Sequence, residues 1–250
     1  MHTTALAVGL LSAACLLSPG ATPEASTAGR LAPGEHFPRP AEPLIVSGPG
    51  DRNTSLLDLV GDLARIGGVN VSLSADVRAT LEATPVGLVS EAVVPPEAVW
   101  AFAESLLQHH GYVVSELRGS EPRLISVHSV NEHASGFRWV PIEASQVDAY
   151  GDHAALLVET WVSFENLDTR QLITSMRGIM LDGTQAALAL GSSNSVFLRG
   201  TGSRVAALVA LMRGADREAG TWIERRREQQ ARDAAAADED DEVDEAEGGR

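Results

Sequence analysis

The chain has 250 residues and a formal net charge of −15, from 19 basic and 34 acidic side chains. This length has room for one large domain or two small ones, and a hydrophobic fraction of 44% is typical of a chain with a folded core. The charge argues against a groove for nucleic acid and against a surface for anionic lipids, because both depend on clustered Lys and Arg.

The N-terminal part of the sequence has the pattern of a secretory leader. Residues 5–17 form an apolar run too short to span a bilayer, and small residues follow it, which predicts a signal peptide over residues 1–28. No Lys or Arg precedes this run, which departs from the usual pattern. The single cysteine, Cys15, lies in the leader. We expect it to be removed with the signal peptide; the alternative is a lipidated Cys15. Either way the mature domains contain no disulfide.

Both flanks of the central region are unlike a folded domain. Four prolines between residues 28 and 43 predict a linker, which we assign to residues 29–42. Residues 217–250 are expected to be a charged helix and an acidic tail, because residues 233–250 contain nine acidic side chains and one Arg. We interpret the tail as disordered; the alternative is a docking tail for a basic partner.

Residues 43–131 contain the pattern of a small two-layer domain. A short strand at residues 44–47 precedes a helix with apolar residues at i, i+3 and i+4 spacing from Leu56 to Ile66. Strands are predicted at residues 69–73 and 86–93. A second helix begins at Pro95 and Pro96, ends at Gly111, and leads into a hairpin. This order predicts an α+β domain.

Residues 132–216 repeat the mixture of strands and helices. A strand is predicted at residues 156–164, followed by a helix that Asp168 caps. Two further strands at residues 185–190 and 195–199 lead into a helix with buried aliphatic residues from Val205 to Met212. The sequence therefore predicts the α+β class, with two small two-layer domains and disordered ends.

The order of these motifs resembles the N-domains of bacterial secretins from type II secretion and type IV pilus systems. Three segments resemble the first N-domain of that family, which is also present in some TonB-dependent receptors: "VNVSLSADV", "PPEAVWAFAESLLQHHGYVV" and "RLISVHSV". The second is resembled by "SNSVFLRGTGSRVAALVALMRGAD". The resemblance implies that the second domain is KH-like. Two features depart from the family pattern: residues 137–155 form a long junction, and no pore segment follows Asp216.

The sequence offers little for chemistry. Its central histidines lack the helical spacing of zinc ligands, and it has no nucleophile elbow and no phosphate-binding glycine loop. We therefore expect no catalytic, cofactor-binding or metal-ligating residue and no enzyme activity. Trp100 lies off the apolar stripe of its helix, and Trp222 lies on the helix after the second domain. Both could contribute to a protein interface, although ordinary packing is the favoured interpretation. The histidines in question are His109, His110, His128, His133 and His153.

The resemblance implies a protein–protein assembly or docking element of a secretion system. Its expected partners are proteins, either further copies of the chain or secretion-system components such as an inner-membrane platform protein, and not nucleic acid. The implied location is the periplasm or the outer membrane, reached through a partner or a lipidated Cys15. We expect contacts through strands or helix faces near residues 69–73 and 195–199. The alternatives are a signalling module of the TonB-receptor type that meets an anti-sigma regulator, and an unrecognised hydrolase.

Overall fold

The computed structural model describes residues 36–48, 54–132, 136–176, 184–190 and 194–247, with side chains as far as Asp233. The described residues belong to one compact unit, Leu31–Arg250. Their helices and three small sheets confirm the predicted α+β class. The predicted signal peptide, Cys15 included, lies outside the described residues. Below, the N-terminal half denotes residues 36–132 and the C-terminal half residues 136–247.

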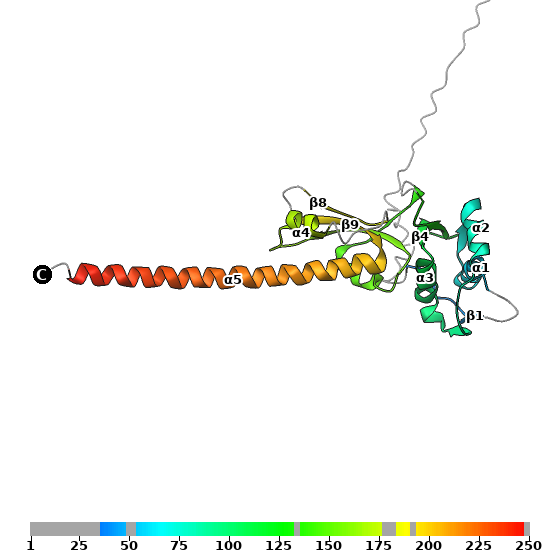
Figure 1. Ribbon diagram of the computed structural model, residues 1–250, viewed down its shortest axis with the longest axis horizontal. Coiled ribbons are helices and arrows are strands. Elements are labelled where there is room, and N and C mark those ends of the chain that lie inside the picture. Colours follow the sequence, from blue (N-terminus) through cyan, green and yellow to red (C-terminus); the bar gives the residue numbers. More distant parts are fainter. Residues whose placement is uncertain (1–35, 49–53, 133–135, 177–183, 191–193, 248–250) are drawn as a thin grey trace, which may run out of the picture. The chain divides into compact units, whose positions relative to one another are not determined.

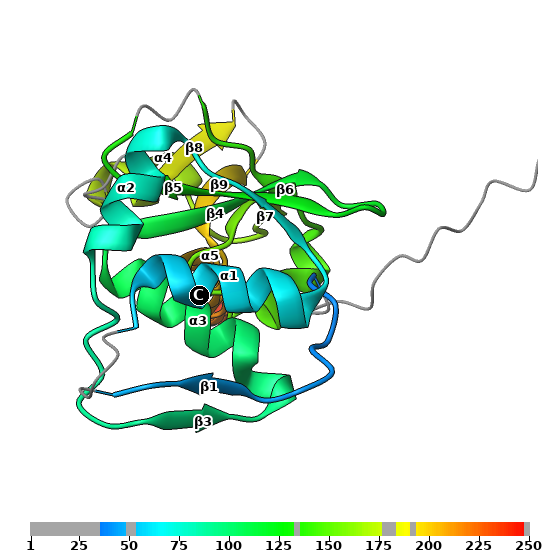
Figure 2. The same cartoon turned by 90° about the vertical axis from the view of Figure 1, so that its right-hand side faces the viewer.

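Two small sheets and three helices build the N-terminal half. In Figure 2, the helices α1 and α3 lie between the two-stranded sheet and the three-stranded sheet. The two-stranded sheet pairs β1 and β3 in antiparallel register, and the other sheet has the order β2-β5-β4. The elements are β1 (Leu44–Val46), α1 (Leu56–Gly67), β2 (Asn70–Ser72), α2 (Ala75–Ala83), β3 (Ala92–Val94), α3 (Val99–His109), β4 (Tyr112–Arg118) and β5 (Leu124–Ser129).

Local signals explain the ends of α1. Ser55 caps its first turn in a capping box with Asp58, in which the Ser55 hydroxyl accepts from the Asp58 backbone N–H. Gly68 follows the last turn with a φ of 63°, a left-handed conformation that glycine adopts without strain. The predicted helix is confirmed at both ends, and its apolar stripe is buried.

The segment after α1 differs from the prediction. The strand β2 covers only Asn70–Ser72, and Ser74 then caps an unpredicted helix, α2. Only Val77 and Leu81 of that helix are buried, so its apolar periodicity is weak. The strand predicted at residues 86–93 is likewise reduced to Ala92–Val94.

The C-terminal half contains one four-stranded sheet with the order β6-β7-β9-β8. From β7 onward its elements follow the order strand, helix, strand, strand, helix. The helices α4 and α5 contact this sheet (Figure 1). The strand β9 is central, between β7 and β8. The elements are β6 (Val140–Pro141), the 3-10 helix η3 (Ala144–Tyr150), β7 (Leu157–Ser163), α4 (Thr169–Met176), β8 (Ala186–Leu190), β9 (Ser195–Thr201) and α5 (Gly202–Glu247).

The last helix is longer than the sequence predicts. The helix α5 runs without a break through 46 residues, about 69 Å at 1.5 Å per residue. It includes Asp216, where we expected the second domain to end, and the acidic segment that we expected to be disordered is helical as far as Glu247. Alanine and long polar side chains in this segment favour a helix, which outweighs the local repulsion between its carboxylates.

Candidate interaction surfaces and the domain junction

A buried carboxylate on α3 joins the two halves of the chain. Glu104 has 1% of its surface exposed. Its Oε2 atom accepts hydrogen bonds from the backbone N–H groups of Ala155 and Leu156, each at 2.9 Å. Its Oε1 atom lies 2.8 Å from Nδ1 of His153. A carboxylate removed from water is costly unless donors replace the lost hydration, and these groups supply them.

The residues that Glu104 binds form a short segment, residues 153–156, which we call the junction segment. On the N-terminal side, the backbone N–H of Val114 donates to Ala155 O at 2.8 Å. On the C-terminal side, the Gly202 N–H at the start of α5 donates to Leu156 O at 2.9 Å. A Cβ atom on Gly202 would lie 2.7 Å from Tyr150 O, so only glycine fits this close approach. The junction segment is therefore held from both halves.

Part of the predicted linker is also built into the junction. Residues 36–40, which we call the strap, pack against α3 and η3 instead of leading freely into the first strand. Phe37 is buried and stacks on Trp100, whose indole N–H donates to Pro38 O at 2.9 Å. The guanidinium of Arg123 donates to His36 O at 2.8 Å. The linker prediction over residues 29–42 thus does not describe this part of it.

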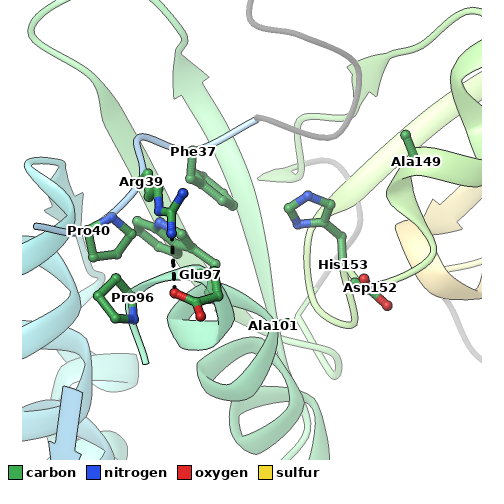
Figure 3. A pocket seen from close by; sticks show the side chains of 10 residues that line it. Phe37, Arg39, Pro40, Pro96, Glu97, Ala101, Ala149, Asp152 and His153 are labelled. Carbon is green, nitrogen blue, oxygen red and sulfur yellow. Dashed lines mark hydrogen bonds and ion pairs between the residues drawn. The ribbon is translucent and has the colours of Figure 1, made fainter. Parts of the chain in front are cut away.

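A cavity of about 270 Å³ lies beside the strap. Figure 3 shows side chains that line it. The His153 ring, from the C-terminal half, points toward the Phe37 ring of the strap (Figure 3), and Trp100 and Asp152 also line the cavity. Burial and the nearby charge of Glu116 raise the pKa of Tyr150, whose ring packs near His153. The full lining is Phe37, Arg39, Pro40, Pro96, Glu97, Trp100, Ala101, Ala149, Asp152 and His153.

Two exposed apolar patches lie outside the junction. The first, the Ile45 patch, is the directly opposed pair Ile45 and Val93 on the outer face of the β1–β3 sheet, exposed by 57% and 64%. The neighbours Leu44, Val46 and Val94 point inward and are buried. The alternation is that of strands with one buried face, except that the outer face is apolar instead of polar.

The second patch crosses three strands of the larger sheet. Trp161 on β7 and Leu188 on β8 are both register partners of Phe197 on β9, and they are exposed by 59% and 58%. The rings of Trp161 and Phe197 lie 4.8 Å apart. We call Trp161, Phe197 and Leu188 the Trp161 patch. Solvent-exposed aromatic and aliphatic neighbours of this kind are typical of protein interaction sites.

The expected contact strands fall in different environments. The strand β2, within residues 69–73, is at the edge of its sheet, as an edge-strand contact requires. The strand β9, at residues 195–199, is paired on both sides, so only its outward side chains can meet a partner. The strands at the edges of that sheet are β6 and β8, which were not expected to be contact strands.

In the part of the chain that the structure describes, the histidines form at most pairs. The ring centroids of His109 and His110 are 5.1 Å apart, and those of His36 and His153 are 6.5 Å apart. His110 follows α3 and its Nε2 atom lies 3.2 Å from Val86 O, while His128 lies 3.2 Å from Glu132. No three His, Cys, Asp or Glu side chains converge as metal ligands within the described ranges. His133 lies outside them.

The tryptophans divide between packing and exposure. Trp100, for which ordinary packing was the favoured interpretation, is half-buried under the strap. Trp139 is half-buried with the Arg199 guanidinium 4.6 Å from its ring centre. Trp161 and Trp222 are exposed. Each helix between residues 36 and 247 that the structure describes is too short or too polar to cross a bilayer.

The order and pairing of the elements define an α+β fold. Among solved structures, the chain is similar to one from the type II secretion system outer membrane complex of Klebsiella pneumoniae, with PulD, PulS and the PulC HR domain. The TM-score is 0.51 at 16% identity, over 66% of this chain and 26% of that chain. The chain thus spans about a quarter of that neighbour, and the likeness is one of fold.

Two other neighbours come from the same class of system. One is the GspC–GspD complex of enterotoxigenic Escherichia coli, at 15% identity over 70% of this chain and 99% of that chain. The other is the N-terminal domain of the secretin XcpQ from Pseudomonas aeruginosa, at 13% identity over 70% and 64%. Both TM-scores are 0.26, so these two neighbours do not support the fold assignment. No protein-family model and no curated protein sequence matches the chain.

Proposed function

We propose that this chain is a docking element of a type II secretion or type IV pilus-like apparatus, with no enzyme activity of its own. The observation that carries the proposal is the likeness in fold to a chain of the Klebsiella complex. That complex contains PulD together with PulS and the PulC HR domain. By analogy, the partners of this chain are secretion-system proteins or further copies of itself.

The two exposed patches support a docking role. The Ile45 patch and the Trp161 patch lie on different sheets, one in each half of the chain. Exposed apolar side chains gain free energy when a partner removes them from water, which favours association. Two separate patches allow one chain to contact two neighbours in an assembly.

The proposed domain boundaries, export and location are based on the sequence. The halves correspond to two domains, residues 43–131 and 132–216, the second KH-like, followed by residues 217–250. A signal peptide over residues 1–28 exports the chain to the periplasm or to the outer membrane. In that location its partners are an inner-membrane platform protein or the outer-membrane complex itself.

Site-specific photo-crosslinking in the native organism tests this proposal. A photoreactive amino acid is placed at Ile45 or at Trp161, and Glu82, an exposed polar position on α2, serves as the matched control. We expect crosslinks from both patches, but not from Glu82, to secretion-system proteins or to a second copy, identified by mass spectrometry. Crosslinks to an anti-sigma regulator instead, or none above the control, would overturn the proposal.

A further inference from the structure

Glu104 lies in a chemically unusual position that the docking role does not use. It is a fully buried acid on the apolar side of α3, where the neighbours Ala103 and Leu107 are packed in the core. An alanine or leucine would bury more apolar surface at no cost in desolvation. A carboxylate at such a position requires a structural or conformational reason.

The donors that satisfy this carboxylate belong to the other half of the chain. Ala155 and Leu156 contribute two backbone N–H groups, and His153 contributes an imidazole nitrogen. One side chain thus collects three polar contacts from one four-residue segment about 50 residues away. Hydrogen bonds to a charged acceptor are roughly twice as strong as neutral ones, and burial protects them from screening by salt.

Few other polar contacts join the halves among the described residues. The Val114 N–H donates to Ala155 O, and the Arg138 N–H donates to the Ser115 hydroxyl at 3.2 Å. Apolar and aromatic contacts also join the halves, such as Phe37 against the His153 ring at 5.9 Å between centroids (Figure 3), and the charge of Glu116 acts on Tyr150. Apolar contacts are non-directional and permit sliding, whereas two backbone hydrogen bonds to one carboxylate fix an orientation.

We propose that Glu104 is a lock that fixes the orientation of the two halves, and that breaking the lock leaves both halves folded but able to reorient. The lock acts on the junction segment, which α5 holds through Gly202 on its other side. Locked, the chain presents the Ile45 patch and the Trp161 patch at one fixed separation. This inference concerns the chain alone and does not depend on the identity of any partner.

Distance measurements between spin labels test the lock. Labels are placed on cysteines at Val89 and Leu188, which are exposed positions in the two halves, in a background with Cys15→Ser. Glu104→Gln keeps the side-chain shape but removes the charge and one acceptor oxygen. Glu82→Gln, at an exposed acid on α2 away from the junction, is the matched control.

We expect a narrow distance distribution in the parent chain and in Glu82→Gln, and at least a twofold broader one in Glu104→Gln. Hydrogen exchange provides the second readout. The Ala155 and Leu156 amides should exchange about tenfold or more faster in Glu104→Gln, while amides within the β4–β5 and β7–β9 ladders keep their protection. An unchanged distribution, or a loss of protection throughout both sheets, would show that Glu104 is not a lock between folded halves.

Discussion

The ring of Phe37 stacks on the ring of Trp100, with centroids 4.2 Å apart and planes inclined by 23°. The contact joins residues 63 positions apart in sequence, one in the strap and one on α3. The Trp100 indole also donates to Pro38 O, so the strap is held by both an apolar and a polar contact. A segment with the composition of a linker is therefore part of the folded structure.

Replacement of Phe37 by Ala tests the strap. The substitution removes the stacked ring and leaves a cavity in its place, because Phe37 is buried. We expect it to lower the free energy of unfolding by about 3 kcal/mol. Denaturant unfolding followed by tryptophan fluorescence measures this loss. The control is Arg39→Ala, at an exposed side chain of the same segment, with an expected change within about 0.5 kcal/mol. Equal stability of the two variants would mean that the strap is only a linker.

The capping box of α1 predicts a second effect. Ser55→Ala removes the hydroxyl that accepts from the Asp58 N–H, so we expect a loss of about 1 kcal/mol in the free energy of unfolding. Thermal unfolding provides the measurement. Thr80→Ala, an exposed hydroxyl in the interior of α2, is the comparison and should cost less. A Ser55 variant as stable as the parent would contradict this account of the helix start.

The same capping box predicts how stability depends on acid. Hydrogen bonds from the Ser55 backbone and hydroxyl lower the pKa of Asp58 below its ordinary value of 3.8. Because the folded pKa is depressed, the contribution of Asp58 is complete above pH 3.8 and is lost as the pH falls through the folded value. The free energy of unfolding, measured against pH, should therefore decrease less in acid for Asp58→Asn than for the parent chain. Identical pH profiles would contradict this assignment.

The two tyrosines predict the behaviour in alkali. Burial raises the pKa of Tyr112, although a hydrogen bond with Thr84 opposes the shift, and burial with the Glu116 charge raises that of Tyr150. In the folded chain the pKa of each tyrosine exceeds the ordinary 10.0. The stability that the two protonated tyrosines contribute is therefore present below pH 10 and is lost as the pH rises through their folded pKa. In a titration with alkali, phenolate absorbance should appear at a higher pH in the native chain than in the denatured chain. Coincident titrations would contradict the burial of both rings.

The helices were predictable where caps and apolar spacing agree, and the exceptions have physical causes. Ser55, Gly68 and the apolar stripe define α1, and Gly111 ends α3 with a φ of 79°. The helix α2 escaped prediction because it buries only two apolar side chains and depends on the Ser74 cap. A weakly amphipathic helix next to a short strand has no distinct period in the sequence.

The junction could not be predicted because its contacts are distant in sequence. The sequence held one signal of the junction, which is that Glu104 is a charged residue on the apolar stripe of its helix. Two of the groups that donate hydrogen bonds to it are the backbone N–H groups of residues 155 and 156, which any sequence provides. The Trp161 patch was also hidden, since an exposed Trp and a buried Trp look alike in a strand pattern. The register of three paired strands, set by tertiary packing, brings Trp161, Phe197 and Leu188 together.

Adjacent residues on β7 offer a test of that register. Trp161 points outward and Val162 is buried. Trp161→Ala should change the free energy of unfolding by no more than about 0.5 kcal/mol, whereas Val162→Ala should lower it by about 2 kcal/mol. Chemical denaturation of both variants measures the difference. A larger loss for Trp161→Ala would contradict the exposure of the Trp161 patch.

Direct binding between the purified full chain and the periplasmic domain of the inner-membrane platform protein of the same organism tests the docking claim most directly. We predict saturable binding that Ile45→Asp weakens about tenfold or more, because a charge replaces an apolar contact, while Glu82→Gln leaves it unchanged. Light scattering on the same samples reports self-association. A strictly monomeric chain that does not bind the platform domain at about 100 μM, a weak limit for specific assemblies, would contradict the claim.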